Sequence, residues 1–271
     1  MKQAFKRFLH SRGLYEPLKY SLPFRLWQRL FKPAVIAAAR HEVAFYRSFV
    51  PPCALIFDIG GNDGHKTEAF LHLAQTVVTC EPDAQNVRTL EVRFRNRRRR
   101  VHIEPLALGA APGTLALQVH HPGSAFNTLN PKFKGITEAD GAHRWNELIA
   151  FTGTVEVPVT TLDALIAKYG EPAFVKVDVE GYELEVLRGL SRPVAFLSLE
   201  CLFPEFRDEL AESLAHIMKL DPDAQFSISM HERLQFPGWL SRSALQEVLD
   251  SWTEPHFELI VQMPAARAST R

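Results

Sequence analysis

Glycines and acidic residues follow an apolar segment near residue 56, at a spacing that suits a small-molecule pocket. The segment from Ile56 to Ile59 contains Asp58 and runs into Gly60 and Gly64, and Glu81 follows about 20 residues further on. Glycines after a buried strand let the backbone approach a ligand closely, and a later acid can accept hydrogen bonds from both hydroxyls of a ribose. The pattern therefore predicts a pocket for a nucleoside-containing cofactor.

The glycine pattern argues against a dinucleotide. A dinucleotide fingerprint that starts at Gly60 needs glycines at two later positions, which hold Asn62 and His65. The segment suits S-adenosylmethionine (SAM), which has one ribose, no phosphate and a cationic amino-acid tail. Asp58 can accept from the ammonium group of the tail, directly or through water, Gly60 leaves room for it, and Glu81 accepts from the ribose. We also count Asn62, Asp63 and Gly64 among the cofactor-binding residues of this pocket.

A second apolar segment ends in acidic residues. Val175 to Val179 contains Lys176 and Asp178, Glu180 follows directly, and Glu200 ends the next expected strand. The carboxyl ends of parallel strands meet at one edge of a sheet, so these three acids are expected to converge beside the cofactor. A carboxylate near a hydroxyl can act as a general base. Carboxylates with water molecules can also bind Mg²⁺, and the sequence leaves that metal open.

The acids can be ranked by position. Asp178 is the first candidate for general base or metal ligand and Glu200 the second, with Lys176 and Glu180 orienting the base. The alternative for Asp178 and Glu180 is capping of a helix N-terminus, where acids are stabilised by free amides. His120–His121 offers a different base, since histidine is the side chain that most often acts as a general base.

Six short segments stand in an order and at spacings typical of one family. They are Phe57–Gly64, Glu81–Pro82, Ala107–Gly109, Thr161–Asp163, Lys176–Glu183 and Ser198–Glu200. With them the chain resembles the FkbM-type SAM-dependent methyltransferases. The resemblance implies a Rossmann-like class I methyltransferase fold of the α/β class, a doubly wound seven-stranded sheet with an antiparallel last strand. It also implies an O-methyltransferase acting on a hydroxyl of a sugar, glycan or natural product. It adds to the cofactor-binding candidates Pro82, Ala107 and Leu108.

The chain divides into a basic N-terminal segment and a longer α/β segment. Residues 1–50 hold ten Lys or Arg against Glu16 and Glu42, and apolar residues recur there at helical spacing. We expect a helical cap that packs on the core, or that docks on a membrane surface or another anionic partner. Residues 51–271 are expected to form the methyltransferase domain.

The α/β segment alternates strand-like and helix-like stretches. Strands are expected at 54–59, 76–81, 101–107, 174–177, 194–199, 226–230 and 257–262, and helices at 65–74, 84–95, 182–188, 206–219 and 241–250 and from Leu162. An insertion at 109–160 interrupts the alternation near the acceptor site. It should contain a hairpin around 114–120, a loop at 123–135 that includes the acceptor loop Ser124–Thr128, and a strand at 155–160.

Two other functions remain open. Arg93–Arg100 contains six arginines, which with the basic cap could serve an RNA or rRNA methyltransferase. We favour a solvated helix end, because cations are stabilised at a helix C-terminus. A catalytically inactive methyltransferase-fold binding module is the third function considered. Three scattered cysteines, with no secretory signal and no membrane span, predict a cytoplasmic protein.

Overall fold

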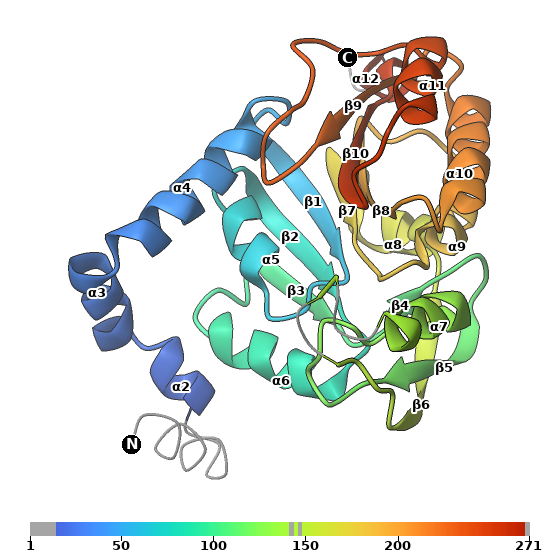
Figure 1. Cartoon of the computed structure of the whole chain (residues 1–271). Coiled ribbons are helices and arrows are strands. Elements are labelled where there is room, and N and C mark those ends of the chain that lie inside the picture. The colour runs from blue at the N-terminus through green and yellow to red at the C-terminus, as the bar shows by residue number, and fades with distance from the viewer. Residues whose placement is uncertain (1–14, 141–143, 146–147, 269–271) are drawn as a thin grey trace.

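The computed structural model describes residues 15–140, 144–145 and 148–268 (Figure 1). Its centre is a seven-stranded sheet of order β3-β2-β1-β7-β8-β10-β9. The strands are β1 (Cys53–Ile59), β2 (Ala74–Cys80), β3 (Val101–Glu104), β7 (Phe174–Val177), β8 (Phe196–Leu202), β9 (Gln225–Ser229) and β10 (His256–Gln262). Strand β10 is antiparallel to both of its neighbours, whereas β3, β2, β1, β7 and β8 pair in parallel. The predicted doubly wound sheet with an antiparallel last strand is confirmed.

Helices cover both faces of this sheet, because β1 is apolar on both sides. Ile56 packs in one core cluster with Phe70 and Leu90, whereas Phe57 and Ile59 pack in the other. The first face carries α4 (Pro33–Arg47), α5 (His65–Phe70) and α6 (Ala84–Arg93). The second face carries α8 (Leu162–Tyr169), α9 (Glu183–Arg188), α10 (Arg207–Leu220) and α11 (Arg242–Asp250). The short α12 (Pro264–Ala268) follows the last strand.

A separate three-stranded sheet of order β4-β6-β5 lies in the insertion. It consists of β4 (Ala107–Leu108), β5 (Gly113–Val119) and β6 (Gly153–Thr160). The hairpin predicted around 114–120 is wrong, since β5 is a single strand that pairs antiparallel with the distant β6. The loop predicted at 123–135 also ends early, in α7 (Pro131–Ala139). Proline occupies the first turn of α7, and the Asn130 side chain accepts from the Lys132 amide at 2.8 Å, which together start the helix.

The N-terminal segment forms helices α2 (Tyr15–Lys19), α3 (Leu22–Phe31) and α4. The C-terminal half of α4 packs into the core, where the Tyr46 ring lies 4.8 Å from that of Phe70. In Figure 1 the first half of α4 leads away from the sheet to α3. The part of the predicted cap at residues 1–14 lies outside the described residues. Within the described chain, no helix combines the length and apolar character that crossing a bilayer requires.

The arginine run after α6 is partly used inside the fold. Arg93 binds Glu68 through two nitrogens, and Arg97 pairs with the same carboxylate. Arg100 donates to the carbonyls of Leu71 and Ala74 at 2.7 and 2.8 Å. These three arginines therefore hold α6 and the start of β3 against the α5–β2 connection, which differs from a wholly solvated helix end.

Candidate functional site

A cavity of about 200 Å³ lies at the carboxyl edge of the parallel strands, between the main sheet and the insertion. Nine of the residues predicted for the site line it, namely Gly60, Asn62, Glu81, Pro82, Ala107, Leu108, Asp178, Glu180 and Glu200. The four predicted residues outside the lining are Asp58, Asp63, Gly64 and Lys176. The acceptor loop also contributes, through Ser124, Ala125, Asn127 and Thr128. The structure thus gathers residues from widely separated parts of the sequence around one space.

Glu81 is held rigidly in the cavity wall. Its two carboxylate oxygens accept from the backbone amides of Asn62 and Asp83, each at 2.8 Å. Burial raises the pKa of Glu81 to about 7, although the two amides favour its ionised form. The Asn86 side chain also hydrogen-bonds this carboxylate. A carboxylate has about four lone-pair sites, so an ionised Glu81 can still accept from a ribose hydroxyl.

The glycine turn after β1 is shaped by the protein itself. Gly60 has a φ of +84°, and a Cβ there would lie 1.8 Å from the carbonyl oxygen of Asp178. Gly64 has a φ of +81°, and its Cβ would lie 2.7 Å from Leu90 of α6 and 2.6 Å from Phe94, the residue after this helix. Both positions therefore require glycine because neighbouring chain segments approach closely.

Asp58 and Asp63 support this turn from behind. Asp58 is 1% exposed and accepts from the Thr67 hydroxyl at 2.5 Å. Burial raises its pKa, against the attraction of Lys176. Asp63 accepts from the His65 amide at 3.0 Å and pairs with Arg93 at 3.2 Å. These contacts link the turn to α5 and α6.

A lysine–aspartate pair lies beside the cavity. Lys176 is 4% exposed, and its Nζ is 2.5 Å from Oδ2 of Asp178. Burial disfavours both charges, but Lys176 together with a hydrogen bond to Glu200 lowers the pKa of Asp178 to about 2, and Asp178 together with further carboxylates nearby raises the pKa of Lys176. Asp178 is therefore a permanently ionised carboxylate near neutral pH.

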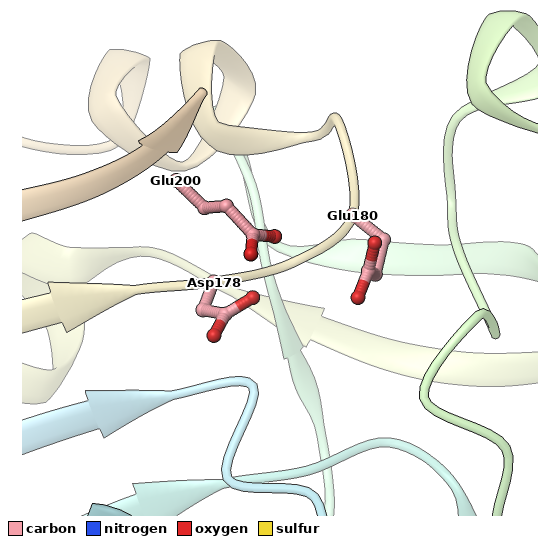
Figure 2. Close-up of side chains that lie close together, drawn as sticks. All are labelled: Asp178, Glu180 and Glu200. Atoms are coloured by element: carbon pink, nitrogen blue, oxygen red, sulfur yellow. The ribbon is translucent and has the colours of Figure 1, made fainter. Parts of the chain in front are cut away.

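Glu200 lies next to this fixed negative charge (Figure 2). Burial, and then repulsion from Asp178, raise the pKa of Glu200 to about 7. His256 at the start of β10 has its Nε2 2.7 Å from Oε1 of Glu200, and that hydrogen bond raises the pKa of the imidazole. The His256 side chain is 53% exposed. A proton on Glu200 thus has a titratable neighbour that reaches solvent.

Glu180 is the third acid of this group, and its backbone is constrained. Its φ is +56°, which is uncommon for a residue with a side chain. The Thr128 hydroxyl donates to the Glu180 carbonyl at 2.8 Å, and Glu183 accepts from the flanking amides of Val179 and Gly181. Burial, and then the charges of Glu200 and Asp178, raise the pKa of Glu180 well above its usual value.

Sequence reasoning missed His256 and Asp83. Asp83 caps α6, and its Oδ2 accepts from the Asn127 side chain at 2.8 Å and from the Gly123 amide at 3.2 Å. An acid directly before a helical stretch could have signalled the cap but not the link to the insertion. The predicted alternative base, His120–His121, lies outside the cavity lining, and Nδ1 of His120 is 2.8 Å from the carbonyl oxygen of Ala150.

One group of acids in the described part of the chain has the geometry to hold a metal ion. Carboxylate oxygens of Asp178, Glu180 and Glu200 lie within 4.8 Å of one another. Figure 2 shows the three side chains. Hard oxygen ligands of this kind suit Mg²⁺. The ion pair between Lys176 and Asp178 already places a positive charge beside this group of acids.

The cavity residues fit the parts of a SAM molecule. Glu81 offers free lone pairs for a ribose, and Leu106, Ala107 and Leu108 provide an apolar wall for a base. Asp178 offers an ionised oxygen to a cationic tail. Asp58 is buried away from the lining, so its contribution runs through the turn.

The strand order, the antiparallel β10 and a cavity at the carboxyl edge define the class I methyltransferase fold. The model of the methyltransferase FkbM domain matches residues 58–228, which is more than half of the chain. The chain belongs to the FkbM methyltransferase family. The predicted family and fold class are therefore confirmed, and no curated protein matches the chain.

Solved structures similar to the chain include the following three. The FkbM methyltransferase of Methylobacillus flagellatus KT shares 16% identity at a TM-score of 0.48, over 78% of this chain and 44% of that one. Precorrin-6y C5,15-methyltransferase of Geobacter metallireducens GS-15 shares 10% identity at a TM-score of 0.40, over 83% and 86%. SMU.1697c of Streptococcus mutans, a putative methyltransferase in complex with SAH, shares 10% identity at a TM-score of 0.39, over 83% of this chain and 97% of that one. The chain thus spans less than half the length of the first of these proteins.

Proposed function

We propose that the chain is a SAM-dependent O-methyltransferase that methylates a hydroxyl of a sugar, glycan or natural product. The observation that carries the proposal is Glu200, a cavity carboxylate whose pKa lies near 7, beside the ionised Asp178. A hydroxyl is a poor nucleophile and needs a base, and a base is most effective when its pKa is close to the working pH. Family membership supports the methyl-transfer part of the proposal.

Each residue of the acid group has a separate task in this mechanism. Bound SAM, held by Glu81 and the glycine turn, would supply an electrophilic methyl group. Glu200 takes the proton of the acceptor hydroxyl as the oxygen attacks, and His256 passes that proton toward solvent. Asp178, kept ionised by Lys176, keeps the pKa of Glu200 high. We thus reverse the ranking suggested by sequence, since a carboxylate with a pKa of about 2 is a weak base.

Radiolabelled SAM tests the proposal when it is incubated with a panel of glycans and hydroxylated metabolites. We expect base-stable label transfer to an acceptor oxygen, with release of S-adenosylhomocysteine. Calorimetry with S-adenosylhomocysteine is the companion measurement. Failure to bind it would leave the inactive binding module as the better proposal.

The RNA alternative has less support. It depends on the basic cap and on Arg93–Arg100, and within that run Arg93, Arg97 and Arg100 are engaged with Glu68 or with backbone carbonyls. Filter binding at several salt concentrations distinguishes the two functions. Tight RNA binding that weakens steeply with salt would favour the RNA enzyme.

Replacing Glu81 with Gln should weaken S-adenosylhomocysteine binding about ten- to a hundredfold, as expected for losing hydrogen bonds to a charged group. Both Glu81 oxygens accept from amides, so the Gln nitrogen would face a donor in either orientation. For wild type, affinity should fall as the pH drops through about 7, because protonation removes an acceptor. Calorimetry across pH checks both effects.

The exposed Glu91 on the outside of α6 provides the matched control. Glu91→Gln removes one negative charge, as Glu81→Gln does, and should leave the dissociation constant for S-adenosylhomocysteine unchanged. Equal affinity of Glu81→Gln and wild type at every pH would remove Glu81 from the cofactor site.

We expect turnover to persist after exhaustive dialysis against EDTA. The positive charge of Lys176 already sits 2.5 Å from Asp178, so the acid group is partly neutralised without an added ion. The measurement is the initial rate of methyl transfer before and after dialysis, with Mg²⁺ re-added as the control. Activity that disappears and returns only with Mg²⁺ would assign the three acids to a metal instead.

A further inference from the structure

Helix α3 presents an apolar face that the described chain leaves uncovered. Leu22 and Leu30 are each 74% exposed, and Phe31 is 64% exposed. Leu26 and Trp27 on the same helix are also exposed. The helix packs on α2 and α4, and in Figure 1 it lies at the outer bend of the arm formed by α2, α3 and α4. Large apolar side chains gathered in this way mark an interaction surface.

Polar residues of α3 are separated from this face. At 3.6 residues per turn, Leu22, Leu26 and Leu30 form one row along the helix and Trp27 and Phe31 form the adjoining row, whereas Gln28 lies on the side away from Leu26 and Leu30 and Arg29 lies at the edge beside Leu22. Lys32 follows the last turn, with its Nζ 6.0 Å from the Trp27 ring centre. Residues 17–41 contain no Asp or Glu. The helix is therefore both amphipathic and cationic.

We propose that α3 docks on the surface of an anionic lipid bilayer and lies in the plane of the interface. Interfacial helices combine a broad apolar face carrying Trp, Phe and Leu with a cationic polar face. With ten residues α3 is too short to span a bilayer. A symmetric dimer that pairs this segment with itself would bring no acid to the α3 cations, because residues 17–41 have none, whereas anionic lipid headgroups complement them.

The arm connects this surface to the cofactor turn. At the start of the arm, Nζ of Lys19 and the hydroxyl of Tyr20 both lie 3.4 Å from Oδ2 of Asp63. At its end, Phe45 and Tyr46 of α4 are buried in the core. Docking of α3 would therefore hold the catalytic domain at the bilayer through contacts at both ends of the arm.

Vesicle co-sedimentation of the full chain tests the proposal, using phosphatidylcholine with about one quarter phosphatidylserine, an anionic composition that attracts cationic segments. We expect binding to these vesicles, weaker binding to pure phosphatidylcholine, and a decrease with added salt. The double variant Leu26→Asp/Leu30→Asp should bind at least about tenfold more weakly, since interfacial binding scales with buried apolar area.

Leu148 supplies the matched control, because it is 77% exposed but lies in the insertion. Leu148→Asp should bind vesicles as wild type does, and all variants should melt at the same temperature. Wild-type binding by Leu26→Asp/Leu30→Asp, or no binding by wild type, overturns the proposal. Sedimentation velocity tests a second copy as the partner. If wild type forms a dimer, does not bind vesicles, and loses the dimer in the double variant, the proposal is overturned and the face belongs to a second copy.

Discussion

Replacing Glu200 with Gln is expected to lower kcat by about 10²- to 10⁴-fold, the usual loss when a general base is removed. Gln fills the same volume but cannot take a proton. Binding of S-adenosylhomocysteine should change little, since Glu81 and the glycine turn hold the nucleoside part. Measured together, the methyl-transfer rate and the dissociation constant separate loss of chemistry from loss of binding.

The pH dependence gives this prediction a second readout. Burial and the charge of Asp178 raise the pKa of Glu200 to about 7, and the base works only when deprotonated. The wild-type kcat should therefore rise as the pH increases through about 7 and then level off. The residual activity of Glu200→Gln should lack this rise. Glu247→Gln, on the exposed side of α11, is the control and should retain the wild-type profile.

A Glu200→Gln variant that keeps most of its activity would assign the base elsewhere. Asp178 would then be the next candidate, as the sequence ranking proposed. The two carboxylates are adjacent, so substitution of either changes the electrostatic environment of the other. The pH profile is the observation that distinguishes them, because Asp178 would give a rise far below pH 7.

The sheet could be read from the sequence because each strand has a local signal. Strand β7, for example, was predicted at 174–177 and is observed at Phe174–Val177, where apolar residues lie between polar turns. The pairing of β5 with β6 had no such signal. The two strands are separated by more than thirty residues that include α7, and alternation within β5 is equally compatible with a local hairpin.

The gathering of the acids could also be predicted, but their protonation could not. Parallel strands bring Asp178 and Glu200 to one edge by topology alone. Their separate pKa values depend on burial, on the interaction between the two acids, and on Lys176 and His256, which reach them through specific side-chain distances. In the β10–β8 ladder His256 lies opposite Leu202, two residues from Glu200, and this register follows from tertiary pairing.

The contact made at Gly60 could not be predicted from the sequence either. Spacing identified the residue as one that needs glycine, and the expected reason was room for the cofactor. The nearest atom to a Cβ at this position is the Asp178 carbonyl oxygen, which belongs to the next strand connection. Gly60 thus brings the cofactor turn and the catalytic loop into direct contact, which sequence spacing does not reveal.

Replacing Gly60 with Ala should therefore affect both stability and turnover. A left-handed conformation costs a residue with a side chain about 1 to 2 kcal/mol. The contact of 1.8 Å with the Asp178 backbone adds an overpacking cost of about 1 to 3 kcal/mol. Together they should lower the melting temperature by roughly 5 to 10 °C in a domain of this size. Thermal unfolding followed by circular dichroism measures this change.

Turnover should fall further than the loss of folded protein alone would cause. The reason is that relief of the clash must move Asp178 or the turn that holds the nucleoside. Rates measured well below the melting temperature of the variant isolate this effect. Gly238→Ala is the control, since a Cβ there meets no atom within 4 Å, and it should match wild type in both assays. A Gly60→Ala variant with wild-type melting and turnover would mean that the two connections are not in contact, and that Gly60 does not couple the cofactor turn to the acids.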